Sequence, residues 1–202
     1  MPPRSNTRQR LIDAAIAIMD DKGPARLRLR DVADAVGIKE PSVYKFFENR
    51  DALIVAAGAT RYARGIREMS ERFALLAEKA STRDEFHELV RQTVVASTVP
   101  ERVSDRAGRV VAVGMALSRP DLAAQIRHVQ AEANAQVAKG LARGVQHGWV
   151  RKDIPLDVLA HWATGLVSSR VYLELDPLMA DAAVWDQLTT EALLAVMVSS
   201  DT

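Results

Sequence analysis

The stretch that decides the fold is residues 29–47, LRDVADAVGIKEPSVYKFF. Apolar residues recur at helical spacing up to Val36, and Gly37 follows at the point where a helix needs a left-handed C-terminal cap. Apolar periodicity resumes at Val43. The sequence therefore predicts two short helices joined by a tight turn, which is a helix-turn-helix.

The second of these helices is predicted over residues 40–46. It would bury Val43 and leave Ser42, Tyr44 and Lys45 pointing away from the core. Hydroxyl and ammonium groups of this kind donate hydrogen bonds to phosphate oxygens and to the edges of DNA bases. The exposed side of this helix is therefore a candidate nucleic-acid contact.

Arginines alternate at positions 26, 28 and 30, directly before the helix-turn-helix. Such alternation fits an extended basic strand whose arginines are only solvated. The helix-turn-helix that follows favours a second interpretation, in which Arg28 and Arg30 lie against the DNA backbone.

The composition indicates a substantial core, since 48% of the 202 residues are apolar. No run approaches the roughly 18 apolar residues that span a bilayer, and the basic start lacks the apolar segment of a secretory signal. We therefore expect a cytoplasmic protein without a membrane partner. The absence of cysteine excludes disulfides, thiolate metal sites and cysteine nucleophiles.

Charge is unevenly divided along the chain. Residues 1–50 carry 10 Lys and Arg against 7 Asp and Glu, a net charge of +3, whereas residues 51–202 carry 17 against 19, a net charge of −2. The basic excess coincides with the helix-turn-helix, although three charges also fit an ordinary solvated surface.

The rest of the chain has helical periodicity and little β signal, so we expect an all-α fold of about nine helices. Asn6 is placed to cap the first helix and Asn49 the fourth, which we expect to run unbroken to about Lys79, roughly 45 Å. The later helices are expected over residues 82–99, 104–118, 120–147, 156–175 and 181–199.

A functional boundary is expected near Arg50. It would divide a three-helix DNA-binding domain with the helix-turn-helix, residues 1–50, from a helical effector-binding and dimerisation domain, residues 51–202. No flexible linker is predicted there, because the fourth helix would join the two parts.

The last two predicted helices have little polar surface, so they must be buried on more than one side. A four-helix bundle shared with a second subunit explains this economically, and it predicts a homodimer. The residues expected at the dimer interface are Leu159, Trp162, Leu166, Val167, Arg170, Leu188, Leu193 and Met197.

Several motifs in order point to a known family. Residues 7–54, TRQRLIDAAIAIMDDKGPARLRLRDVADAVGIKEPSVYKFFENRDALI, contain an Ala-rich helix ending in Lys-Gly, then D-x-A-x-x-x-G, V-Y-x-F-F and Asp-Ala-Leu. This stretch resembles the N-terminal signature of TetR-family transcriptional regulators. Residues 144–169, GVQHGWVRKDIPLDVLAHWATGLVSS, are similar to the segment that precedes and opens the family's dimerisation helices.

The resemblance implies a set of DNA contacts. Tyr44 would donate its hydroxyl to a phosphate, Arg50 would meet a phosphate at the start of the fourth helix, and Lys45 would reach base edges. The full set implied is Lys39, Ser42, Tyr44, Lys45 and Arg50.

Three residues depart from the family pattern. Lys39 stands where a small hydroxyl residue usually caps the recognition helix, and Pro41 removes a backbone donor. Phe46 replaces what is often a second tyrosine, so one phosphate contact is missing.

From this resemblance we expect a homodimeric, ligand-responsive repressor of a palindromic, double-stranded DNA operator. A small apolar or aromatic effector would shift the fourth helix and move the recognition helices out of register. Apolar or amphipathic residues expected to line the effector pocket are Tyr62, Ile66, Met69, Phe86, Val94, Met115, Trp162 and Tyr172. Core packing is the alternative role for each of them.

Two other functions compete with this interpretation. One is an architectural DNA-binding protein without an effector, and the other is an all-helical enzyme with a structural helix-turn-helix. No Ser, His and Asp residues form a recognisable catalytic motif, and the four histidines include no pair at metal-binding spacing. We therefore expect no enzymatic activity, metal or cofactor.

Overall fold

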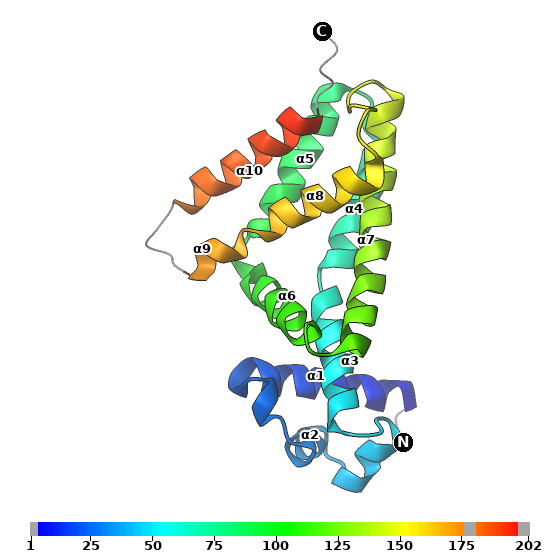
Figure 1. Ribbon diagram of the computed structural model, residues 1–202, viewed down its shortest axis with the longest axis vertical. Helices are drawn as coiled ribbons and strands as arrows, with labels where there is room; N and C mark the ends of the chain where they lie inside the picture. The colour runs from blue at the N-terminus through cyan, green and yellow to red at the C-terminus, as the bar shows by residue number, and fades with distance from the viewer. Residues whose placement is uncertain (1–3, 176–180, 198–202) are drawn as a thin grey trace. The chain divides into compact units, whose positions relative to one another are not determined.

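The computed structural model describes residues 4–175 and 181–197, and every regular element within them is a helix (Figure 1). The all-α prediction is thus confirmed. The described residues divide into two compact units, the first formed by residues 4–64 and 108–127 and the second by residues 65–107, 128–175 and 181–197.

The first unit contains the predicted N-terminal module. Its elements are α1 (Arg4–Lys22), the 3-10 helix η1 (Pro24–Arg26), α2 (Leu29–Val36), the 3-10 helix η2 (Glu40–Lys45) and α3 (Arg50–Ala63). Leu11, Ala15, Val32 and Leu53 are fully buried and join α1, α2 and α3 in one apolar core. The Asn49 cap is confirmed, because its side-chain oxygen accepts a hydrogen bond from the Ala52 N–H at 2.8 Å.

The second unit is built from the remaining helices. It holds α4 (Ile66–Ala77), α5 (Arg83–Thr98), the 3-10 helix η3 (Pro100–Arg102), α8 (Leu156–Ser168), α9 (Val171–Leu175) and α10 (Ala182–Met197). The boundary between the units falls within α6 (Val103–Ala116) and within α7 (Pro120–Gln146), so both helices contribute to each unit.

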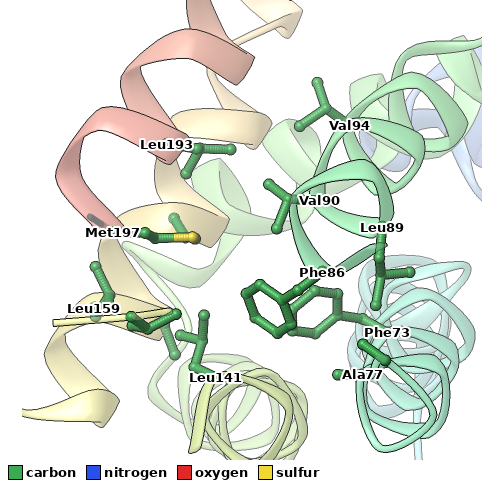
Figure 2. Close-up of a cluster of buried hydrophobic side chains, with 14 residues drawn as sticks. Phe73, Ala77, Phe86, Leu89, Val90, Val94, Leu141, Leu159, Leu193 and Met197 are labelled. Carbon is green, nitrogen blue, oxygen red and sulfur yellow. The ribbon is translucent and has the colours of Figure 1, made fainter. Parts of the chain in front are cut away.

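Aromatic and aliphatic side chains fill the core of the second unit. Figure 2 shows Phe73 and Phe86 facing each other, with Leu141, Leu193 and Met197 around them. The two rings meet edge to face, with centroids 6.3 Å apart. Helix α7 approaches α4 closely because Gly140 has no side chain: a Cβ there would lie 2.6 Å from the Phe73 ring.

Three local predictions are wrong. Helix α1 begins at Arg4, so Asn6 lies inside the helix and does not cap it. The long fourth helix is broken, because Arg64 is extended and Gly65 takes a left-handed conformation with φ of 76°. A side chain at Gly65 would also collide with Arg102, since its Cβ would lie 2.6 Å from a guanidinium nitrogen.

The helix predicted over residues 156–175 is also divided, into α8 and α9. The Ser169 hydroxyl donates a hydrogen bond to the Leu166 carbonyl at 2.6 Å, next to the break. Serine hydroxyls compete with the backbone for such carbonyls, which weakens a helix at that point.

Candidate nucleic-acid interface

The recognition segment η2 occupies the predicted position but has tighter hydrogen bonding than an α-helix. The Ser42 N–H donates to the Lys39 carbonyl at 2.8 Å, and the Phe46 N–H donates to the Val43 carbonyl at 2.9 Å. Both bonds span three residues, as in a 3-10 helix, a form common in short pieces. The segment therefore makes two tight turns from Glu40 to Lys45.

The side chains of η2 point in two directions. Val43 is 0% exposed and packs in the core of the first unit, as Phe47 does one turn later. Tyr44 is 54% exposed, Lys45 is exposed and Ser42 is half-buried. Because Val43 fixes the rotation of the segment, the tyrosine hydroxyl and the lysine ammonium are held toward solvent.

The turn before η2 is fixed by contacts with α1. Gly37 has a φ of 75°, the left-handed conformation predicted for it, and its N–H bonds the Ala33 and Asp34 carbonyls. The Arg10 guanidinium donates to the Val36 carbonyl at 2.8 Å. This α1 contact was not foreseen, since an exposed arginine near the chain start carries no local signal of its partner.

A second arginine of α1 supports the end of the recognition segment. The guanidinium of Arg8 lies 5.0 Å from the centroid of the Phe47 ring, a cation–π contact. The helix-turn-helix is thereby held by α1 on both sides of η2.

Arg50 has a different local environment from the one expected. Its guanidinium donates to the carbonyls of Leu27 at 2.6 Å, Pro24 at 2.8 Å and Ala25 at 2.9 Å. Only Nη1 remains for a phosphate, and it lies 3.8 Å from Asp51. Arg50 therefore ties the η1 loop to the start of α3.

The other predicted DNA contacts lie on the surface. Lys39 is exposed and precedes η2 in extended conformation. Arg28 is exposed before α2, and Arg30 faces Asp34 at 3.8 Å with both side chains largely in solvent. Ion pairs this exposed contribute little to stability, so the arginine can exchange its partner.

An ion pair between buried Arg61 and exposed Asp20 connects α3 to α1 in the same unit. Arg61, which is 9% exposed, donates to Asp20 at 2.6 Å. The arginine passes over Gly108 of α6, where a Cβ would lie 2.3 Å from the Arg61 Nε. The sequence signal for this contact is a single arginine within the apolar run of α3, which gives no indication of its partner.

The residues predicted to line an effector pocket are not gathered within either unit. Phe86 and Val94 are buried in the core of the second unit. Tyr62 and Met115 are buried in the first unit, where burial raises the Tyr62 pKa against the opposing effect of Arg109. Because these four side chains are buried, each is best explained as a packing residue in the core of its own unit.

The other predicted pocket residues are more accessible. Trp162 is partly exposed and Tyr172 strongly exposed. Ile66 and Met69 are half-buried, and Met69 borders a small hollow of about 30 Å³ between α4 and α5. That hollow has room for about one water-sized group.

Several predicted dimer residues belong to the protein's own core. Leu159, Leu193 and Met197 are almost fully buried in the second unit, so this part of the dimer prediction is wrong. Leu166 and Val167 pack partly against the same core. The misassignment arises because residues that face an intrachain core have the same apolar periodicity as residues that face a subunit.

Arg170 also has partners within the chain. It donates to Asp186 at 2.9 Å and lies 3.7 Å from Glu174. The arginine is therefore committed to holding α8, α9 and α10 together, which differs from the predicted contact with a second subunit.

An apolar surface remains on α8 and α10. We define the α8/α10 face as the exposed residues Val158 and Trp162 of α8 with Val184 and Leu188 of α10. Each pair is four residues apart and so lies on one side of its helix. Trp162 and Leu188 were predicted at the dimer interface, whereas the two valines were not.

No helix in the described residues is both long and apolar enough to cross a membrane. Within the same residues, no group of three or more His, Cys, Asp or Glu side chains is arranged to hold a metal ion.

Comparisons with known proteins agree with the local geometry. Residues 11–57 match the family described as "Bacterial regulatory proteins, tetR family". A putative TetR-family regulator from Mesorhizobium loti is 18% identical and has a TM-score of 0.74, covering 96% of this chain and 98% of that one. No curated protein matches the chain.

Two further solved structures have the same fold and carry ligands. A putative transcriptional regulator from Saccharomonospora viridis, in complex with choline, is 15% identical with a TM-score of 0.71, covering 97% of this chain and 100% of that one. The regulator FadR from Bacillus subtilis, in complex with stearoyl-CoA, is 14% identical with a TM-score of 0.64. The match covers 93% of this chain and 98% of that one.

Residues 11–57, which contain the helix-turn-helix with its exposed tyrosine and lysine, match the tetR family of bacterial regulatory proteins. Over nearly its whole length the chain has the all-helical fold of solved TetR-family regulators.

Proposed function

We propose that the protein is a homodimeric repressor that binds a palindromic operator and releases it when a small-molecule effector binds. The observation that carries this proposal is the arrangement of η2, where buried Val43 holds Tyr44 and Lys45 toward solvent. These side chains supply a hydroxyl for a phosphate oxygen and an ammonium for a phosphate or a guanine edge.

Recognition of an operator needs two copies of this segment. In a symmetric dimer the two recognition segments enter successive major grooves about 34 Å apart, which requires an inverted repeat in the DNA. Lys39 and Arg28 extend the positive surface around each segment and favour contact with the phosphate backbone.

The α8/α10 face supports the dimer. Its four side chains are large, apolar and exposed, and Leu188 is 59% accessible in the single chain. Exposed apolar surface of this kind marks interaction sites, and a twofold axis would pair the face with itself. The dimer interface proposed here therefore consists of Val158, Trp162, Val184 and Leu188.

Effector control is supported by the fold and by the ligands in related structures. The regulators from S. viridis and B. subtilis are bound to choline and to stearoyl-CoA. An effector acts by binding the DNA-incompetent state more tightly, and a shift from 99:1 to 1:99 requires about 5.5 kcal/mol of differential binding. We place this control in the helical body of residues 51–202.

The test is binding to the DNA that flanks the protein's own gene, measured by electrophoretic mobility shift against bulk DNA at fixed salt. The proposal expects a specific complex on a fragment that contains an inverted repeat, with an affinity at least 1000-fold above bulk DNA. Equal affinity for all fragments would favour the architectural alternative.

A further inference from the structure

A polar cluster lies between α7 and α8 in the second unit. Asn134 of α7 is 4% exposed, and its side-chain oxygen accepts a hydrogen bond from the Gln130 amide at 2.9 Å. The Thr164 hydroxyl of α8 lies 3.1 Å from the same oxygen and 2.8 Å from the Ala160 carbonyl. One end of the Asn134 amide is thereby fixed from both helices.

The other end of this amide is buried without a partner. The Asn134 Nδ2 has no hydrogen-bond acceptor in the part of the chain that the structure describes. Reversing the amide would turn its nitrogen toward Gln130 and Thr164 and leave the oxygen unpaired instead. Either orientation leaves one end of a buried amide open to a further hydrogen bond, and such groups are rare because they lose their bonds to water.

Small apolar residues are buried close to Asn134 and Thr164 in the sequence. Ala133 precedes Asn134 on α7, while Ala160 and Ala163 lie within one turn before Thr164 on α8. Apart from Gln130 and Thr164, these neighbours offer hydrocarbon to a molecule that meets the amide.

Two buried arginines in the same unit have carboxylate partners. Arg106 is bound by Glu174 and donates to the Ser97 carbonyl at 2.7 Å. Arg170 donates to Asp186. These two arginines and two carboxylates balance one another in charge. The Glu174 oxygen that has no hydrogen bond, Oε2, belongs to a carboxylate already paired with both arginines.

We propose that the Asn134 amide is the polar anchor of the effector site, and that the effector is a neutral, largely apolar molecule with a hydroxyl or carbonyl oxygen. The inference rests on the effector control proposed above and names the chemical class that this site accepts. In the described orientation, Nδ2 donates to the effector oxygen, while Gln130 and Thr164 hold the amide in place.

This chemistry differs from that of the ligands in the two related structures. A quaternary ammonium such as choline is recognised by aromatic faces or carboxylates, and an acyl-CoA carries phosphates that need basic side chains. The groups bonded to Asn134 are an amide and a hydroxyl, which favour an uncharged partner.

The first experiment measures stability without ligand. Asn134→Leu keeps the approximate side-chain shape and removes both the unpaired Nδ2 and the oxygen that Gln130 and Thr164 contact. Thr164 keeps its bond to the Ala160 carbonyl and Gln130 is only half-buried, so loss of the unpaired Nδ2 is expected to outweigh the lost bonds and raise the melting temperature by about 2–4 °C. A fall in melting temperature would mean that the amide is already satisfied and structural, which overturns the proposal. Ser70→Ala is the control. It removes a buried hydroxyl that is already bonded to the Arg67 carbonyl at 3.0 Å, so it is not expected to raise the melting temperature.

The second experiment measures binding of three named probes by calorimetry: resorcinol as a neutral probe, choline as a cation and stearoyl-CoA as an anion. Resorcinol is expected to bind wild type, and its affinity is expected to fall about tenfold in Asn134→Leu. The isosteric Thr164→Val, which removes one support of the amide, is expected to cause a smaller loss. Absence of resorcinol binding, binding of a charged probe in its place, or equal resorcinol binding by Asn134→Leu would each overturn the proposal.

Operator binding without any probe separates this inference from the proposed function. Wild type and Asn134→Leu are expected to bind the same DNA equally, because the amide lies outside the helix-turn-helix. If both bind the operator but resorcinol has no effect, the anchor proposal fails and repression stands. If neither binds specific DNA, the proposed function itself fails.

Discussion

The recognition segment and the helical body use the same kinds of residue in different ways. In residues 29–47 each functional side chain is placed by an apolar neighbour one or two positions away, as Val43 places Tyr44 and Lys45. In the body, Asn134 of α7 and Thr164 of α8 meet across two helices although they are 30 residues apart in the chain. Local sequence therefore determines how side chains are positioned in the recognition segment, whereas tertiary packing determines it in the helical body.

The largest expected effect comes from the recognition segment. Tyr44→Phe with Lys45→Ala removes two contacts in each subunit, and at about 1 kcal/mol each the loss is about 4 kcal/mol, or about 1000-fold in operator affinity. Fluorescence anisotropy with labelled operator measures it. Lys79→Ala removes an exposed positive charge elsewhere and serves as the control. A loss below threefold in the double variant would place the interface on another surface.

The next effect tests the dimer. Leu188→Asp places a charge on the α8/α10 face, so we expect monomers in size-exclusion chromatography and a loss of about 100-fold in operator affinity, since two-site binding is lost. Leu75→Asp, at an equally exposed leucine of α4, is the matched control and should stay dimeric. Dimers of Leu188→Asp would show that another face joins the subunits.

A smaller effect is expected at Gly108. Gly108→Ala adds a methyl group that displaces Arg61 from Asp20 and loosens α1 against α3, so operator affinity should fall about tenfold and the melting temperature should drop. Gly114→Ala changes the same helix where nothing lies within 4 Å of the new Cβ, so operator affinity should be unchanged and the melting temperature should not drop. Equal operator affinities and melting temperatures for the two variants would argue against a role for the Arg61–Asp20 ion pair.

Variants of Arg50 distinguish two roles for this residue, a structural contact within the chain and a contact with a DNA phosphate. Arg50→Lys keeps the charge but not the three hydrogen bonds to the η1 loop, so we expect a loss of about 1–2 kcal/mol in stability by urea unfolding. Arg50→Ala should be similarly unstable. If Arg50→Lys is as stable as wild type and only Arg50→Ala loses DNA affinity, Arg50 acts mainly by contacting a DNA phosphate.

The smallest effect concerns His87. Burial, followed by Arg83 and Arg91, lowers the pKa of this histidine in the folded state, so the unfolded chain binds the proton more strongly. Stability should therefore decrease as pH falls below the unfolded pKa of about 6.5. Urea unfolding of His87→Gln between pH 5 and 7.5 should show a shallower dependence, and an unchanged slope would assign the effect to other groups.

The sequence predicted the elements whose signals are local. The cap at Asn49, the left-handed Gly37 and the position of η2 follow from residues within one turn of each other, and the structure confirms them. The family resemblance was confirmed for the same reason, because its motifs lie in one continuous stretch.

The failures involve contacts that sequence spacing does not encode. The break at Gly65 interrupts a periodic apolar pattern that continues on both sides, and the left-handed glycine conformation fits against Arg102. Leu193 was assigned to a subunit interface because an apolar stripe does not specify what covers it. Arg50 and Asn134 depend on partners 23 and 30 residues away, so neither role had a local signal.

Footprinting of the flanking DNA tests whether two copies of η2 read an inverted repeat. We expect two protected half-sites with centres about one helical turn, 10–10.5 base pairs, apart, and no protection with the Tyr44→Phe, Lys45→Ala variant. Protection without symmetry, or protection that survives in the variant, would contradict it.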